Sequence, residues 1–161
     1  MDFNFLAFLL IAFVPLIVAY FWYRPSSKVV KWANPERLLD LSKLSPPTIV
    51  LAFFLSLSIV FGYINLVIHQ VGFVELFFTD IILGSEEAEA IVTDFLAKYG
   101  DKHRHFGHGA FHGVIIAFVF ALPFVTIQAL LTEQKRRFVV FHFGYWLVTS
   151  ILIGGLISQF V

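Results

Sequence analysis

Four of the six histidines lie in one short stretch between Gly100 and Gly113, and a carboxylate precedes them. At the helical repeat of about 100° per residue, side chains that are four, three and four positions apart fall on one face of a helix. The residues with that spacing are Asp101, His105, His108 and His112. One helix face would therefore carry several groups that can bind a metal ion or a proton.

Two imidazoles separated by one helical turn can both reach a single metal ion. Nitrogen ligands joined by a carboxylate oxygen suit zinc or another divalent transition metal. The predicted ligands are His108 and His112, with His105, Asp101 and His69 as further partners. His69 would come from a second helix at a similar depth. The set differs from the His-Glu-x-x-His pattern of metalloproteases, and no general base stands between the pair.

Alternatives to metal binding remain open for each histidine. His103 and His105 can be solvated residues at the membrane surface, as can His69. His108 and His112 can be packing residues that are hydrogen-bonded to a carbonyl or a hydroxyl, or they can handle protons. His142 lies near the other end of the last apolar run, where it can bond to a neighbouring helix or act as a proton relay.

The elements that must position these residues are membrane helices. A mean hydropathy of +0.86 and a charged fraction of 14% lie outside the soluble globular range. Four apolar runs are long enough to cross a bilayer, at about residues 3–23, 48–69, 106–131 and 138–160. The predicted fold is one all-α integral membrane domain (1–161) with four transmembrane helices. The histidine face enters the third span, and an ionisable group there is a functional-site hypothesis.

The loop at 70–105, between spans two and three, is acidic and contains amphipathic sequence. Ser85 followed by Glu86 to Glu89 has the pattern of a capped helix start, and Gly100 is a natural helix stop. We predict an amphipathic helical cap over the outer ends of the spans. Residues 70–84 can extend span two, re-enter the membrane or lie on its surface.

Proline and small residues predict how the spans bend and pack. Pro15 and Pro123 should kink spans one and three. Small residues recur every fourth position in span three and again in span four, which predicts close backbone contact between these spans. The rows include Gly109, Gly113 and Ala117 in span three, and Ser150, Gly154 and Ser158 in span four.

The charge distribution predicts the topology. The loops after spans one and three carry eight of the eleven Lys and Arg residues, whereas the loop after span two is acidic. By the positive-inside rule, both basic loops are cytoplasmic, and both termini and the acidic loop lie outside.

Three segments carry a resemblance to a known family. Span one ends in Trp22-Tyr23-Arg24-Pro25, followed by Lys31-Trp32, and span three contains His108-Gly-Ala-Phe-His112-Gly and then Ala121-Leu-Pro123. Span four contains Phe141-His-Phe-Gly144-Tyr-Trp-Leu-Val-Thr149, leading to Gly154. These segments resemble a bacterial four-span family of unknown function, number 1761 in the series of domains of unknown function. The resemblance implies a multi-pass protein of the bacterial inner membrane with four helices, and it brings no activity.

Two functions follow from these observations. The first is a small inner-membrane protein, forming a homo-oligomer, that binds or transports a divalent metal ion or protons at its outer face. The second is a structural or accessory subunit of a larger membrane complex, with other membrane proteins as partners and no metal. A membrane enzyme is the least favoured class, because bis-histidine haem needs two axial histidines at one depth on opposing helices. Nothing in the sequence indicates nucleic-acid binding, and the absence of cysteine excludes a thiolate site.

Overall fold

The computed structural model describes residues 3–33 and 44–161, and every regular element in those ranges is helical. Span one consists of α1 (Phe5–Ile11) and α2 (Val14–Tyr23), and span two is α4 (Pro46–Val67). Span three consists of α7 (Phe106–Ile116), the π-helix η2 (Ala117–Ala121) and α8 (Leu122–Leu131), and span four is α9 (Arg136–Phe160). All four are long and apolar enough to cross a membrane. The predicted all-α fold with four transmembrane helices is confirmed, and the predicted span ends differ from the observed ones by two residues at most.

Span one breaks where the prolines of the sequence predict a bend. The α-helix stops at Ala12 and Phe13 and restarts at Val14, so Pro15 occupies the first turn of α2, where its missing N–H costs nothing. The Tyr145 hydroxyl of span four donates a hydrogen bond of 3.0 Å to the Pro15 carbonyl. A polar group from a neighbouring span therefore fixes the position of α2, as membrane interiors require.

Span three changes its helix type just before Pro123. The five residues Ala117–Ala121 form a π-helix, and Pro123 follows at the start of α8. A π-turn inside an α-helix is a common cause of a local kink. The π-helix therefore lies where the sequence predicts a kink.

Spans three and four pack backbone against backbone. A methyl group added to Gly109 or to Gly113 would collide with backbone atoms of α9 at Gly154 and at Ser150. Ala117, one turn further, is fully buried. The predicted contact between the two rows of small residues is confirmed, and α7 and α9 form the most extensive contact between any two described helices.

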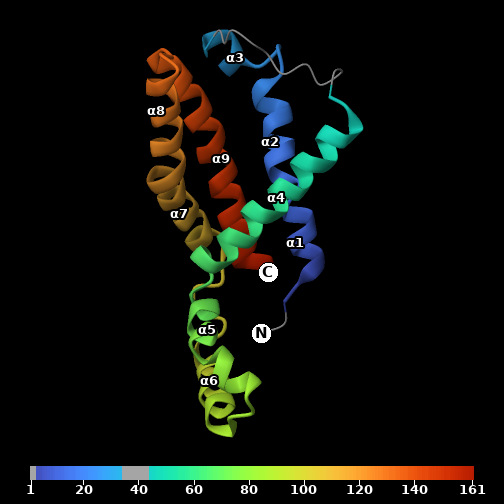
Figure 1. The fold of residues 1–161 in the computed structure, drawn as a ribbon, viewed down its shortest axis with the longest axis vertical. Coiled ribbons are helices and arrows are strands. Elements are labelled where there is room, and N and C mark those ends of the chain that lie inside the picture. Colours follow the sequence, from blue (N-terminus) through green and yellow to red (C-terminus); the bar gives the residue numbers. More distant parts are fainter. Residues whose placement is uncertain (1–2, 34–43) are drawn as a thin grey trace.

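Span two crosses the others at a steep angle, as Figure 1 shows. Its second half is packed, with Val60, Tyr63, Ile64 and Val67 in the core together with residues of α1 and α9. Its first half is exposed from Pro46 to Leu51. The bundle is therefore closed at the end where α4 finishes and open at the end where α4 begins.

The segment between spans two and three is a helical hairpin made of α5 (His69–Ile82) and α6 (Glu86–Tyr99). The Ser85 hydroxyl accepts a hydrogen bond from the Ala88 amide, and α6 ends at Gly100, so both predicted helix boundaries are confirmed. Residues 70–82, for which the sequence left three possibilities, form a helix of their own after a break at Ile68. The hairpin extends away from the bundle and does not spread across its whole end (Figure 1).

The side-chain amide nitrogen of Gln70, Nε2, links the hairpin to the loop that follows it. This nitrogen lies 2.9 Å, 3.1 Å and 2.9 Å from the carbonyl oxygens of Tyr99, Gly100 and Lys102. Carbonyls at a helix C-terminus lack partners within the helix, so a side chain that supplies donors stabilises the turn. The Phe73 and Phe95 rings, one from each helix, stack at 3.7 Å between centroids.

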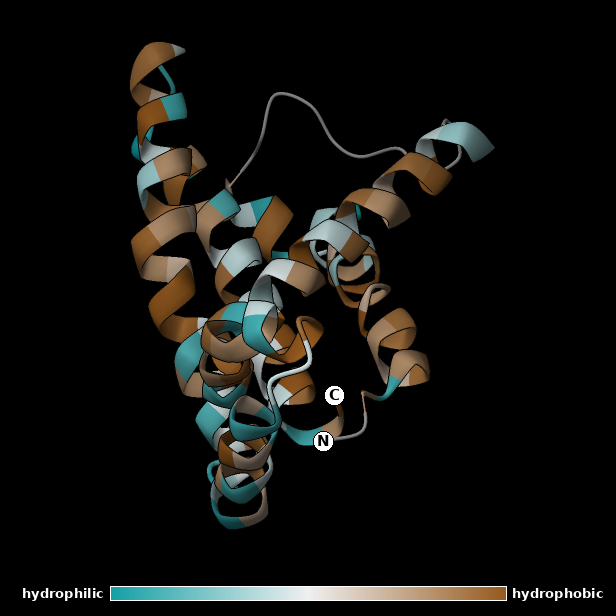
Figure 2. Ribbon diagram, turned by 60° about the horizontal axis from the view of Figure 1, so that its bottom comes forward, coloured by the Kyte–Doolittle hydropathy of each residue, from teal (hydrophilic) through white to brown (hydrophobic). Residues whose placement is uncertain are grey.

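The ends of the bundle differ in charge. Helix α3 (Lys28–Ala33) and the α8–α9 connection, which hold basic residues, lie at one end, and both termini lie nearer the other (Figure 1). Figure 2 shows that hydrophobic residues dominate the spans, whereas hydrophilic residues gather on the hairpin. Arg37 and Lys43 of the first basic loop lie outside the described residues. The chain is thus a multi-pass membrane protein with its basic connections at one end.

Candidate metal centre

Three histidines from two parts of the chain meet at the end of the bundle that faces the hairpin. One ring nitrogen from each of His69, His108 and His112 lies within 4.8 Å of the other two. The centroid of the His69 ring lies 5.5 Å from that of the His108 ring and 4.8 Å from that of the His112 ring. The centroids of the His108 and His112 rings are 4.7 Å apart. The structure therefore brings together three of the five predicted ligands.

The local folding of two helices explains this meeting. His108 and His112 are one turn apart in α7, so their side chains share a face. His69 is the first residue of α5, immediately after Ile68 adopts an extended conformation and ends α4. The break turns the chain at the depth of α7. His69, His108 and His112, which we call the triad, can therefore meet only because α4 ends there.

His105 has a structural role that the sequence did not predict. Its backbone is extended, with φ −151° and ψ 155°, and it is the N-cap residue of α7. Its Nδ1 accepts a hydrogen bond of 3.2 Å from the His108 amide. This bond satisfies one of the amides that a helix start leaves without partners, so His105 supports the centre by fixing α7 and lies outside the triad.

Asp101 and His103 also lie outside the triad, because α7 begins only at Phe106. The prediction that Asp101 and His105 continue the histidine face of the helix is wrong, since the residues before His105 form turns. The His103 backbone has φ 66°, in the left-handed region that is rare for residues other than glycine. Its ring stacks on that of His108 at 4.9 Å, and its carbonyl accepts a hydrogen bond of 3.1 Å from the Ser158 hydroxyl.

The surroundings of the triad suit a cation that requires nitrogen ligands. The Nε2 atom of His108 is buried and has no hydrogen-bond partner within residues 3–33 and 44–161. Buried polar atoms are nearly always paired, so an orphaned one calls for an explanation. His108 and His112 are half-buried and His69 is exposed, so a ligand can enter from the water at this end. A metal ion bound by the three rings would satisfy the orphaned nitrogen.

His142 belongs to a separate polar contact near the basic end. Its Nδ1 lies 2.9 Å from the Tyr23 hydroxyl, a bond that joins spans one and four. In the same region the Trp22 indole donates a hydrogen bond of 3.2 Å to the Phe141 carbonyl. The predicted helix-to-helix hydrogen bond of His142 is confirmed. Tyr23 was missed as its partner, although it lies in the aromatic run that ends span one.

Comparison of the chain with protein-family models, with curated proteins and with solved structures gives no match. The resemblance to the four-span family of unknown function therefore stays a prediction. From its fold and its triad, the chain is a four-span, all-α membrane protein with three clustered histidines at one end.

Proposed function

We propose that this protein binds a divalent transition metal ion through His69, His108 and His112. The observation that carries the proposal is the approach of three ring nitrogens to within 4.8 Å of one another. Zinc with bonds of about 2.0–2.1 Å holds neighbouring ligand nitrogens about 3.4 Å apart in a tetrahedron. Small rotations of the side chains are enough to close the difference, and the fourth position is left for water or an incoming ligand.

The donor set narrows the choice of ion. Three imidazoles without a carboxylate or a thiolate favour zinc, copper or nickel over the hard ions magnesium and calcium, which prefer oxygen. The acidic residues of the α5–α6 hairpin raise the local concentration of cations near the centre. They include Glu75, Asp80, Glu86, Glu87, Glu89 and Asp94.

Binding at one face is favoured over translocation by a single chain. Ion and proton pathways through membranes are lined by ionisable residues. Between the triad and His142, the third and fourth spans hold no charged or histidine side chain. A single chain thus offers no second ligand set in the middle of the membrane. A homo-oligomer of this small four-span chain would place several such centres at one face.

We further infer that the protein lies in a bacterial inner membrane with both termini and the hairpin outside. The support is the distribution of Lys and Arg, which are concentrated in the two connections at the basic end. In this orientation the centre faces the periplasm, where metal ions reach it without crossing the membrane.

The test is elemental analysis of the detergent-purified protein after equilibration with zinc, copper or nickel. The parent should hold close to one ion per chain, and the double variant His108→Ala, His112→Ala should hold none. His142→Gln is the matched control, because it removes a histidine of a span outside the centre. A parent that remains free of metal would refute the proposal and favour the accessory-subunit alternative.

A further inference from the structure

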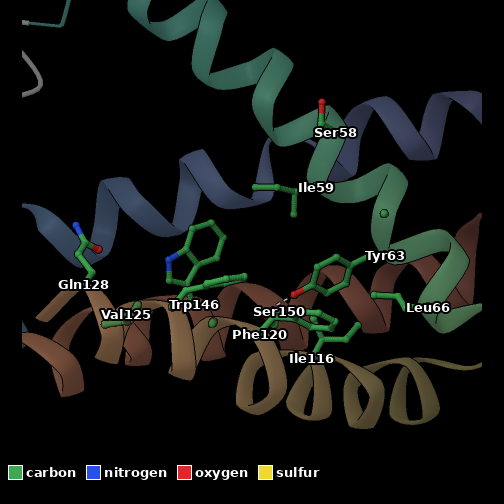
Figure 3. A pocket seen from close by; sticks show the side chains of 13 residues that line it. Ser58, Ile59, Tyr63, Leu66, Ile116, Phe120, Val125, Gln128, Trp146 and Ser150 are labelled. Atoms are coloured by element: carbon green, nitrogen blue, oxygen red, sulfur yellow. Dashed lines mark hydrogen bonds between the residues drawn. The ribbon is translucent and has the colours of Figure 1, made fainter. Parts of the chain in front are cut away.

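A cavity of about 470 Å³ lies between spans two, three and four, away from the histidine centre. Figure 3 shows it from close by, with α4 on one side and the helices of spans three and four on the other. It exists because α4 crosses the bundle steeply and diverges from α8 (Figure 1). Its size lies in the range of pockets that bind small molecules.

The two ends of the cavity differ in polarity. Gln128 and Trp146 lie together at one end, whereas Ile116 and Phe120 lie toward the other (Figure 3). Near the apolar end, the Tyr63 hydroxyl donates a hydrogen bond of 2.6 Å to the Ser150 hydroxyl, so this part of the wall requires no further partner. The cavity therefore has the polarity of an amphiphile: polar at one end and apolar along the rest.

The polar end offers hydrogen-bond donors without partners. The Trp146 indole N–H and the Gln128 side-chain amide make no hydrogen bond with any residue of the described ranges. The Gln128 side chain is exposed and the Trp146 side chain is half-buried, so both donors are open to a ligand. An indole donates only, and a donor that faces lipid without a partner is costly. A ligand with carbonyl oxygens at this end would satisfy both groups.

The cavity extends along the basic half of span three. Gln128 lies three residues before the end of α8, about 4.5 Å along the helix axis from that end. Ile116 lies twelve residues earlier in the span, about 18 Å away. Ile116 is close to the middle of the 26-residue span, so the cavity runs from near the basic end to about mid-membrane, a length that one acyl chain can fill.

Charge beside the polar end selects the head group. Lys135 ends the short connection that follows α8, and Arg136 and Arg137 begin α9. The Arg137 guanidinium lies over the Trp32 ring of α3 at 5.9 Å from its centroid, and Lys135 and Arg136 are exposed. The connection folds back on α8, since the backbone N–H of Gln134 donates a hydrogen bond of 2.8 Å to the backbone carbonyl of Ala129. The exposed basic residues at this level attract an anionic phosphate.

We propose that this cavity binds one acyl chain of an anionic glycerophospholipid from the leaflet at the basic end. The ester carbonyls face Gln128 and Trp146, the chain passes Phe120 toward Ile116, and the phosphate lies beside the basic connection. This site is independent of the histidine centre, which is at the opposite end of the bundle.

Two glycines provide a matched pair of variants. A Cβ atom added to Gly62, on the cavity wall, or to Gly72, in α5, meets no atom within 4 Å. Both glycines are helical, so leucine improves the helix propensity at each by a similar amount. Gly62→Leu fills the cavity without a backbone collision, whereas Gly72→Leu leaves the cavity open.

The experiment is native mass spectrometry of the delipidated full chain, titrated with dioleoylphosphatidylglycerol. The parent and Gly72→Leu should retain one lipid, and Gly62→Leu should bind it about tenfold more weakly, a change of about 1.4 kcal/mol. The double variant Trp146→Phe, Gln128→Leu keeps the cavity shape and removes both donors, so its lipid binding should also be weaker than that of the parent. Circular dichroism of each variant checks the fold.

Three results would overturn the proposal. The first is equal retention by the parent and Gly62→Leu. The second is tighter binding of dioleoylphosphatidylethanolamine or of a quinone than of phosphatidylglycerol. The third is a dimer that Gly62→Leu dissociates, which would make the cavity a contact between two copies of the chain.

Discussion

Gly109 and Gly154 lie so close together that each occupies the space in which the other would hold a side chain. Gly109 directly follows His108, so the contact with α9 sets the position of one metal-binding residue. Spans three and four therefore form a rigid support for His108 and His112, whereas His69 belongs to α5.

Replacing Gly109 by alanine should separate spans three and four and destabilise the protein by about 1–3 kcal/mol, the usual cost of overpacking. The measurement is thermal unfolding in detergent. Gly62→Ala is the control, since its Cβ meets open space and alanine is the better helix former. Equal melting temperatures for Gly109→Ala and the parent would contradict the close contact.

Metal bound by the triad should dissociate as the pH falls. Each imidazole binds a metal only in its neutral form, so protons compete with the ion at three ligands. Occupancy should be full at about pH 8 and fall steeply between about pH 7 and 5, where histidines take up protons. Equilibrium dialysis with zinc over this range measures it. Occupancy that does not change down to pH 5 would exclude histidine ligands.

His103→Gly should retain metal, in contrast to any triad variant. The residue lies outside the group of three, and its φ of 66° is one that glycine adopts without strain. The expected gain in stability is up to about 1 kcal/mol, reduced by the lost stacking on His108. Zinc titration and thermal unfolding of the same preparation give both values. Loss of zinc would place His103 among the ligands.

His105→Asp should keep both the helix start and the metal, because aspartate is among the best N-cap residues. His105→Ala removes the hydrogen bond to the His108 amide and should cost about 1 kcal/mol of stability. It should weaken zinc binding only as far as α7 frays. If the aspartate and alanine variants lose zinc equally, His105 acts as a ligand.

Tyr23→Phe should weaken the link between spans one and four by about 0.6 kcal/mol, the average for hydrogen bonds between membrane helices. The variant leaves Nδ1 of His142 without its partner. Tyr20→Phe is the control, because the Tyr20 side chain is exposed. Unfolding by denaturant in micelles compares the two. A larger loss for Tyr20→Phe would argue against the bond.

The sidedness can be measured with single cysteines, since the chain has none of its own. Glu87→Cys on the hairpin should react with a membrane-impermeant maleimide in intact cells. Gln134→Cys in the basic connection should react only after the membrane is opened. The reverse pattern would invert the proposed orientation, and labelling of both from one side would contradict their placement at opposite ends.

The sequence was sufficient for the spans and for the packing of two of them. Twenty apolar residues in a row have few alternatives in a bilayer, and rows of small residues at every fourth position leave few ways to pack. These features depend on local sequence, which explains why the Gly109 and Gly154 rows were paired correctly.

The composition of the histidine centre was predictable only in part. His108 and His112 follow from the helical repeat, and His69 follows from its depth at the end of span two. The helix start could not be placed from the repeat alone, because His105 is an uncommon N-cap residue and the left-handed turn at His103 has no glycine to mark it. The size and position of the cavity depend on the crossing angle of α4, which no local pattern encodes.

The steep crossing of α4 has a consequence for the membrane itself. The bundle is closed near the histidines and splayed at the basic end (Figure 1), so a bilayer around it would meet a wider cross-section in the leaflet at that end. A wedge of this shape displaces unequal numbers of lipids from the two leaflets. Many copies gathered in one patch would therefore bend the bilayer toward the narrow end, and the protein would itself be most stable where the membrane is already curved in that direction.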